Sequence, residues 1–485
     1  MGGTHHATHD NRLINEDLAP SATRTWQWKD YLFLWMSDIH SVAGYITVGS
    51  LFTLGLPLYD VFAALLFAIL LVQLACNLMA APSFKTGAPF PVIARMTFGV
   101  YGAIIPALIR GIIAVGWYGI QTWLASNALV ILVLKIWPIL EPWADSTQHG
   151  LLGLSYVGWF AFLTVWSLQT LVFWNGMDAI RHFIDWAGPV IYGLMVLLDM
   201  WLLSKTGWHL SFQFFTPHEP ISLLAHTSGI MNAMSLILAF FAPIILNFGD
   251  FSRYGTSLHS IHRGNFWGLP FNFLAFSLLT LVTITLTLPV FGHMIFDPVE
   301  TAVKTTSLGT AIVGVITIVA ATIGINISAN FVSAAFDFSN MAPHHLSWRK
   351  GGLIAAVGAI LFTPWNLYAR PELIHLTLDV LGTFITPLIG IILSDYYIIK
   401  KQIIITDALY SSDQSNVYWY KSGFNLISLL SLLIGTGCGV LFIFLPSLAS
   451  MRNFSCFFGF VIGMLAQILL SSLLSYQYRL KQPTA

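Results

Sequence analysis

A tryptophan and a glutamine lie four residues apart in a long apolar segment, where together they could bind a flat polar molecule. Trp117 and Gln121 belong to the stretch RGIIAVGWYGIQTW, between Gly102 and Trp137. Residues four apart share one face of a helix. At the depth of a bilayer centre, an indole beside an amide is costly unless a planar polar partner meets it. The pair therefore indicates a heterocycle site, although ordinary core packing is an alternative for Trp117 alone.

A second polar face is expected on a later apolar segment. Its polar residues recur at spacings of three and four, at Thr322, Asn326, Asn330, Ser333 and Asp337. Carboxamides suit the alternating N–H and C=O edge of a nucleobase, hydantoin or lactam, and aromatic faces suit the ring itself. Neutral amides also favour an uncharged ligand. The alternative for Asn326 or Asn330 is hydrogen bonding between helices, which is common for such residues in membranes.

A carboxylate lies where the first apolar segment is expected to break. Asp38, in WMSDIHS, is followed by His40 and Ser41. An ionisable group at this depth indicates function, so Asp38 is a candidate carrier of a coupling proton and His40 a second candidate. The structural alternative is that Asp38 caps a broken helix end or pairs with a cation such as Arg110.

The elements that must position these residues are membrane helices. The chain has 485 residues, of which 56% are hydrophobic and only 9% charged, whereas a soluble domain has about 25% charged residues. Lysine plus arginine and aspartate plus glutamate number 21 each, which leaves no basic footprint for nucleic acid. We therefore predict an all-α polytopic membrane protein with the lipid bilayer, and no nucleic acid, as a partner.

Twelve apolar segments are long enough to cross a bilayer, which takes about 20 residues. They lie near residues 31–56, 59–81, 102–135, 151–174, 179–204, 226–248, 265–292, 308–337, 351–368, 374–399, 423–446 and 454–478. Basic residues concentrate in the loops on the side that holds the N-terminus, which predicts that both termini are cytoplasmic.

Spans one and six are each interrupted near the middle, the first around residues 37–44 and the sixth around Phe240–Pro243 with Asn247 and Asp250. Broken helices in corresponding positions of two halves are typical of transporters built from inverted repeats, where the freed backbone groups bind substrate and ion.

Six segments carry a family resemblance. They are NEDLAP (15–20), KTGAPFPVIARMTFG (85–99), GWYGIQTW (116–123), NFGDFSR (247–253), INISANFVSAAFD (325–337) and LSDYYII (393–399). In this order they resemble the nucleobase-cation symporter family one of cytosine/purine, uracil, thiamine, allantoin and hydantoin permeases. The resemblance implies the leucine-transporter fold, with two inverted five-helix repeats plus two C-terminal helices.

On that organisation the chain divides into four parts. We expect a cytoplasmic tail at residues 1–30, a core of ten helices at 31–400, helices eleven and twelve with their preceding cytoplasmic loop at 401–478, and a cytoplasmic tail at 479–485.

The resemblance also implies roles for individual residues. Trp117 and Gln121 fall on the positions that stack on and hydrogen-bond the substrate, and Asn330 on the opposing amide, with Asn326 on the same stripe. The family's second stacking aromatic falls on Phe241, and the polar contact from helix one falls on Ser41.

The coupling ion is where this sequence departs from the family pattern. In sodium-coupled members the ion is held by helix-one carbonyls, here around Ser37 and His40, together with helix-eight positions that include a Ser-Thr pair. This chain has Gly324 and Ile325 at that pair, and Ala321 nearby. Losing hydroxyl ligands leaves a sodium site underfilled, so we predict proton coupling, with a sodium-coupled carrier as the alternative.

We therefore expect a secondary active transporter of the cell membrane, functional as a monomer, that imports a neutral planar nitrogen heterocycle by cation symport with alternating access. A carrier of a vitamin such as thiamine or nicotinamide is an alternative. A membrane-embedded enzyme is a distant one, because GxSxG, HExxH and GxxxxGK[ST] are absent from the sequence. No catalytic residue, cofactor or metal site is predicted.

Overall fold

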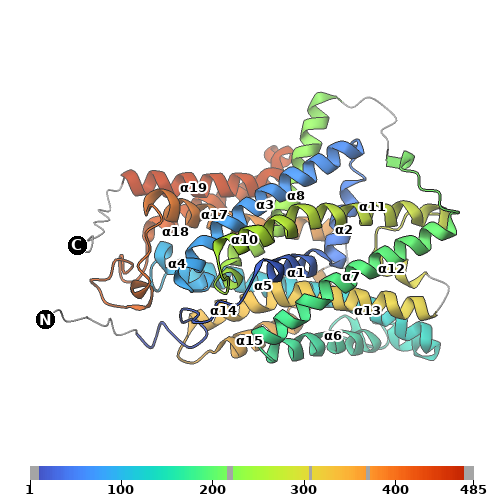
Figure 1. Ribbon diagram of the computed structural model, residues 1–485, viewed down its shortest axis with the longest axis horizontal. Coiled ribbons are helices and arrows are strands. Elements are labelled where there is room, and N and C mark those ends of the chain that lie inside the picture. Colours follow the sequence, from blue (N-terminus) through green and yellow to red (C-terminus); the bar gives the residue numbers. More distant parts are fainter. Residues whose placement is uncertain (1–9, 216–221, 305–307, 368–371, 474–485) are drawn as a thin grey trace.

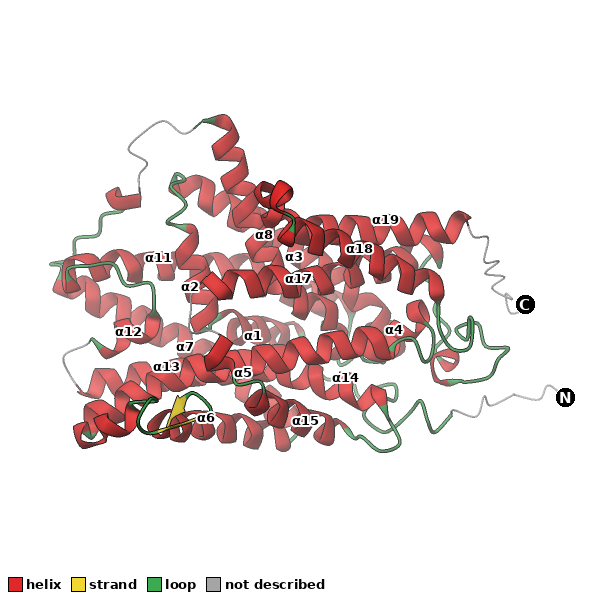
Figure 2. Ribbon diagram, turned by 180° about the vertical axis from the view of Figure 1, so that it is seen from behind, coloured by secondary structure: helices red, strands yellow, loops and turns green. Residues whose placement is uncertain are grey.

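The computed structural model describes residues 10–215, 222–304, 308–367 and 372–473. Helices make up nearly all the regular structure of these ranges (Figure 2), and a short hairpin of β1 (Gly150–Leu151) and β2 (Leu154–Ser155) lies beside α6. The expected tail at 479–485 lies outside the described residues.

The described residues of the first half of the chain form seven α-helices. They are α1 (Trp28–Ile39), α2 (Val42–Leu51), α3 (Leu58–Thr86), α4 (Phe90–Phe98), α5 (Ile104–Ile136), α6 (Tyr156–Trp174) and α7 (Met177–Lys205).

Twelve more α-helices lie in the described residues of the second half. They are α8 (Leu223–Asn247), α9 (Gly249–Ser252), α10 (Leu258–Phe266), α11 (Asn272–Phe291), α12 (Pro298–Val303), α13 (Leu308–Ile325), α14 (Ser333–Met341), α15 (Trp348–Leu361), α16 (Pro364–Leu367), α17 (Glu372–Leu393), α18 (Leu426–Phe444) and α19 (Ser455–Leu473).

Three π-helical segments join or extend these helices: η3 (Trp267–Phe271), η4 (Asn326–Val332) and η5 (Ser394–Ile399). Tighter 3-10 turns occur at η1 (Pro138–Ala144), η2 (Gln213–Phe215), η6 (Asp407–Tyr410) and η7 (Pro446–Phe454).

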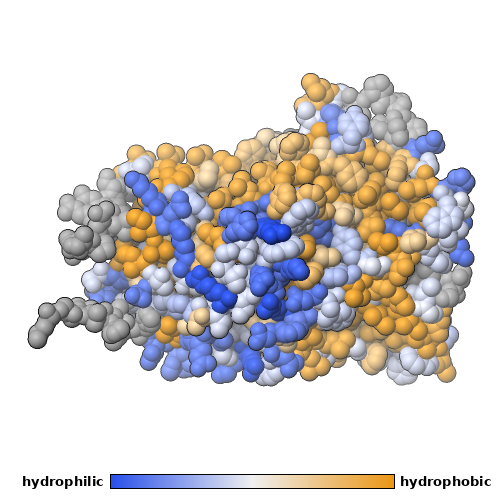
Figure 3. All heavy atoms as spheres, viewed as in Figure 1, coloured by the Kyte–Doolittle hydropathy of each residue, from blue (hydrophilic) through white to orange (hydrophobic). Residues whose placement is uncertain are grey.

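Ten continuous helical segments of the described residues are long and apolar enough to cross a membrane. The other two expected spans correspond to the broken pair α1 and α2 and to α15, which is 14 residues long. The arrangement is consistent with twelve crossings. Figure 3 shows hydrophobic side chains over most of the visible helical surface, with hydrophilic ones gathered over α10 and the beginnings of α1 and α7.

Helix α1 lies in the middle of the bundle, in contact with α7, α10 and α13 (Figure 1). Its first turn is stabilised by Asp30, whose carboxylate accepts a hydrogen bond of 2.6 Å from the Gln27 backbone N–H. The two C-terminal helices α18 and α19 pack on each other and on α17, at the edge of the bundle. They therefore lie away from the central helix.

The predicted break of the first span is confirmed between α1 and α2. His40 ends α1 with an extended backbone, and the Ser41 Oγ accepts a hydrogen bond of 2.9 Å from the Gly44 N–H, which caps α2. A serine in this position satisfies one of the free N–H groups of the new helix. The break therefore leaves backbone groups at the centre of the bundle.

The predicted break of the sixth span at Phe240–Pro243 is wrong in its position. Helix α8 continues through Pro243 and is interrupted only at Phe248, before α9 begins. Proline is tolerated inside membrane helices because neighbouring groups satisfy the freed backbone atoms. Pro243 has no N–H for the Ala239 carbonyl; separately, the Arg110 Nε donates to the Pro243 carbonyl at 3.3 Å.

Candidate substrate site

A small central cavity forms where α1, α5, α8 and η4 meet. Its lining residues are Asp38, Trp117, Gln121, Phe240, Phe241, Pro243, Ile244, Ile325, Ala329 and Asn330. The cavity has a volume of about 30 Å³, well below the roughly 300 Å³ at which small-molecule pockets begin. Side chains must move apart before a ring can enter.

The α5 wall of this cavity consists of Trp117 and Gln121. Both are buried, and both line the cavity from one helix face, as their spacing predicts. The Gln121 Oε1 is buried and has no hydrogen-bond partner among the described residues. A buried polar atom without a partner is uncommon and calls for a ligand or water. Gln121 is thus free to accept a hydrogen bond from a molecule in the cavity.

The opposing wall contains Phe241 and Asn330. The Phe241 ring is held edge-on against Trp35, Phe240 and Phe273, with centroid distances of 6.5, 5.4 and 5.6 Å. This packing fixes a second aromatic surface across from the α5 wall.

Asn326, predicted to contact substrate, does not line this cavity. Its Nδ2 donates to the Tyr118 carbonyl (3.1 Å), to Thr122 Oγ1 (3.1 Å) and to Gln169 Oε1 (2.8 Å). Its Oδ1 accepts a 2.9 Å hydrogen bond from the Asn330 Nδ2. These bonds occupy the amide group of Asn326 and let it orient the Asn330 side chain. The side-chain Oδ1 of Asn330 can then accept a hydrogen bond from a ligand.

Asp38 reaches the same cavity from α1, although it is only 2% exposed. Its Oδ1 accepts a hydrogen bond of 3.0 Å from the Ser328 Oγ. Sequence reasoning missed Ser328 because the expected stripe assumed regular α-helical spacing, whereas η4 is π-helical and changes the register of the face. A π-helical turn at this point is itself a frequent mark of a functional site.

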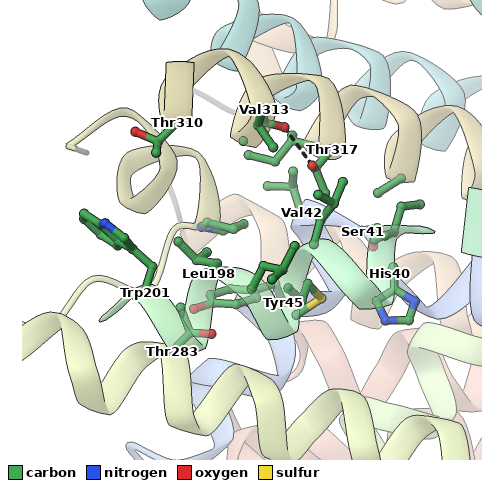
Figure 4. Close-up of a pocket in the computed structure, with 18 of the residues that line it drawn as sticks. His40, Ser41, Val42, Tyr45, Leu198, Trp201, Thr283, Thr310, Val313 and Thr317 are labelled. Carbon is green, nitrogen blue, oxygen red and sulfur yellow. Dashed lines mark hydrogen bonds between the residues drawn. The ribbon is translucent and has the colours of Figure 1, made fainter. Parts of the chain in front are cut away.

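Ser41 and His40 do not line the central cavity. They lie at one end of a separate, apolar cavity of about 310 Å³, with Trp201 at its other end (Figure 4). Ser41 is occupied in capping α2. The His40 ring packs against Tyr192 and Phe276, at 4.5 and 5.0 Å between centroids, and its Nδ1 is bonded to the Met36 carbonyl. The helix break turns both side chains away from Asp38.

The positions of the eighth membrane span that are expected to bind sodium lie on α13, and they carry no side-chain oxygen. A Cβ atom at Gly324 would lie 2.1 Å from the Ser37 Oγ and 3.3 Å from the Ser37 carbonyl oxygen, so α1 and α13 pack closely at this glycine. Ile325 lines the central cavity and Ala321 lines the cavity of Figure 4. Of this set only Ser37 offers a hydroxyl, and its Oγ is buried without a hydrogen-bond partner in the described part of the chain.

Comparison with solved structures confirms the expected fold. The chain superposes with a TM-score of 0.75 on Mhp1, a nucleobase-cation-symport-1 family transporter, in a closed conformation with bromovinylhydantoin bound; the match covers 95% of this chain and 96% of the other at 19% identity. A sodium-coupled sialic acid symporter matches with a TM-score of 0.62 at 11% identity, over 96% of this chain and 93% of its own. The architecture is the leucine-transporter fold.

Sequence relatives are permeases. An allantoin permease of Bacillus subtilis is 33% identical over 468 residues, covering 95% of this chain and 93% of the relative. A purine-uracil permease of Arabidopsis thaliana is 32% identical over 444 residues, covering 88% and 71%. The model of the family described as permease for cytosine/purines, uracil, thiamine and allantoin matches residues 19–469. This multi-pass membrane protein therefore belongs to that family of heterocycle permeases, and it is a transporter rather than an enzyme.

Proposed function

We propose that this protein imports a neutral nitrogen heterocycle across the cell membrane by proton symport. The observation that carries the proposal is the convergence of Trp117, Gln121, Phe241 and Asn330, from three separate elements, on one cavity. Two aromatic faces with two amides between them suit a planar ring whose edge carries both N–H and C=O groups.

Allantoin is the first compound to test, because the permease of Bacillus subtilis that bears its name is similar over nearly the whole chain. Uracil, purines and hydantoins offer the same alternation of donors and acceptors. The cavity supports a neutral ligand, since Asp38 is its one ionisable lining residue and already accepts a hydrogen bond from Ser328.

Substrate binding and protonation would be linked through Asp38, because it lies in the substrate cavity itself. A proton on its carboxyl group removes a buried negative charge beside the ring. A ligand shifts a conformational equilibrium only through different affinities for the two states. The proton on Asp38 would supply that difference. The oxygen-free side chains of Ala321, Gly324 and Ile325 support this choice over sodium.

Alternating access requires a closed route on the inner side, and the N-terminal segment lies in a position to provide it. Arg253, at the end of α9, donates to the carbonyls of Gly87 (2.9 Å) and Asp17 (2.8 Å). The Asp17 carboxylate accepts a 2.8 Å hydrogen bond from the backbone N–H of Trp348. Asp17, Arg253 and Trp348 border a cavity of about 690 Å³, which we propose as the exit to the cytoplasm. We also propose that both termini are cytoplasmic and that the monomer is the functional unit.

The test is transport by the purified protein in liposomes. Uptake of labelled allantoin and uracil is measured under an imposed proton gradient, an imposed sodium gradient, or neither. We expect accumulation of at least one compound with the proton gradient alone. Accumulation that requires sodium and ignores the proton gradient would overturn the coupling, and binding of thiamine or nicotinamide in place of these rings would overturn the substrate class.

A further inference from the structure

Arg110 on α5 lies fully buried among three carboxylic acids, Asp38, Asp250 and Asp337, all within its electrostatic reach. Its Nε donates to the Pro243 carbonyl at 3.3 Å, and its Nη2 donates to the Ala329 carbonyl. Pro243 and Ala329 both line the central cavity. The guanidinium group therefore ties two walls of that cavity together without an ion pair to any acid within 4.0 Å in the described residues.

The two acids on the side away from the cavity are unequally satisfied. Asp250 accepts hydrogen bonds from the Phe90 N–H (2.8 Å) and from the Asn247 Nδ2 (2.9 Å). Asp337 receives only a long contact of 3.4 Å from the same Asn247 amide. Its other oxygen, Oδ1, has no hydrogen-bond partner among the residues that the structure describes, and the residue is completely buried. The Arg110 Nη1 is also buried and has no partner in the same ranges.

Charge balance indicates what occupies this cluster. If Asp38, Asp250 and Asp337 were all ionised, three buried carboxylates would share Arg110 and Arg253, of which only Arg110 acts on Asp337, and a negative charge would remain uncompensated in the interior, which is strongly unfavourable. Of the other charged groups on elements packed nearby, Arg95 donates to the Leu409 carbonyl and to Asn340, and Arg253 donates to backbone carbonyls. Neither donates a hydrogen bond to Asp337 in the described part of the chain. A proton on its Oδ1 restores the balance.

We propose that Asp337 is a second proton-binding site, coupled to the substrate cavity through Arg110. When the Oδ1 loses its proton to the inner side, the new carboxylate attracts the Arg110 guanidinium away from the carbonyls of Pro243 and Ala329. Arg110 then no longer links α8 to η4 across the cavity, the two walls can separate, and substrate is released. When the Oδ1 gains a proton, Arg110 returns to those carbonyls. This inference rests on the proposed proton-driven transport.

The test compares Asp337→Asn, which imitates the protonated acid, with wild type in liposomes, using labelled allantoin and uracil. Because the amide cannot ionise, we expect Arg110 to stay on the two carbonyls, so that the variant binds labelled substrate but loses both its release on the inner side and its accumulation under a proton gradient. Asp199→Asn is the matched control, because Asp199 is also a buried acid of a membrane helix with one oxygen, Oδ2, that has no hydrogen-bond partner in the described residues, but its Oδ1 accepts a 2.5 Å hydrogen bond from Thr283 and no arginine acts on it. The control should accumulate substrate as wild type does.

A second variant gives a directional readout. Asp250→Asn removes the neighbouring negative charge, so the ionised form of Asp337 is better compensated by Arg110. The pH of half-maximal uptake should move to a lower value, which a purely structural role would not predict. Proton-driven accumulation by Asp337→Asn, or an unchanged or alkaline-shifted profile for Asp250→Asn, would overturn the inference. A wild-type protein indifferent to the proton gradient would instead overturn the proposed function as well.

Discussion

Substituting Gly324 by alanine should destabilise the contact between α1 and α13. The added Cβ would lie 2.1 Å from the Ser37 Oγ and 3.3 Å from the Ser37 carbonyl oxygen. The hydroxyl can rotate, but the backbone oxygen cannot move without shifting α1. Overpacking costs about 1–3 kcal/mol, while the better helix propensity of alanine returns about 0.5–1 kcal/mol. We expect a net loss of up to about 2.5 kcal/mol relative to wild type.

The measurement is the apparent melting temperature of detergent-purified protein, at one fixed heating rate because unfolding of such proteins is often irreversible. Gly193→Ala on α7 is the matched control, since its Cβ would have no atom within 4 Å. The double variant Gly324→Ala/Ser37→Ala should recover part of the loss, because it removes the 2.1 Å overlap and leaves the contact with the carbonyl. If Gly324→Ala melts at the same temperature as Gly193→Ala, the close approach of the two helices is wrong.

Three further predictions concern the cavity and the inner side. Trp117→Ala should weaken binding of the transported ring by about 5- to 150-fold, from a stacking contribution of about 1–3 kcal/mol, whereas Trp117→Phe should retain most of it; calorimetric titration decides, and equal affinities of the alanine variant and wild type would refute the stacking role. Asn326 does not line the cavity, yet Asn326→Ala should weaken substrate binding, because Asn330 loses the 2.9 Å hydrogen bond that orients it. Unchanged affinity would contradict this. Lys400→Met should lower the stability of the fold by about 3–5 kcal/mol, since it leaves the buried carboxylate of Asp395 without its 2.5 Å ion pair. Lys400→Met/Asp395→Asn should recover stability in the same melting assay, and a single variant as stable as wild type would contradict a stabilising role of the ion pair.

The amino-acid sequence determined the class of protein and the helices. Low charge and long apolar segments predict a helical bundle in a bilayer. The polar stretch around Asp38 predicted the break of the first span. Trp117 and Gln121 could be placed together because α5 is a regular helix, on which a spacing of four always means one face. The membrane helices, the break of the first span and the shared face of Trp117 and Gln121 are local properties, so the pattern of neighbouring residues is enough to predict them.

Only the tertiary structure decided the places of the other site residues. The π-helical turn of η4 changes the register, so Asn326 bonds to α5 and α6 while Asn330 and Ser328 face the interior. Capping of α2 takes Ser41 away from the cavity. Whether a polar side chain is free for a ligand depends on which groups already form hydrogen bonds with it. Those groups come from distant parts of the chain.

The cluster around Arg110 shows the same limit most clearly. Asp250 and Asp337 are separated by more than eighty residues in sequence, yet they share one asparagine amide. No spacing rule joins them to Arg110 or to the carbonyls of Pro243 and Ala329. The sequence by itself determined that buried acids exist in this membrane protein. Their relation to one arginine and to the substrate cavity was decided by the packing of the helices, because the electrostatics of a buried charge depends on distance in space rather than along the chain.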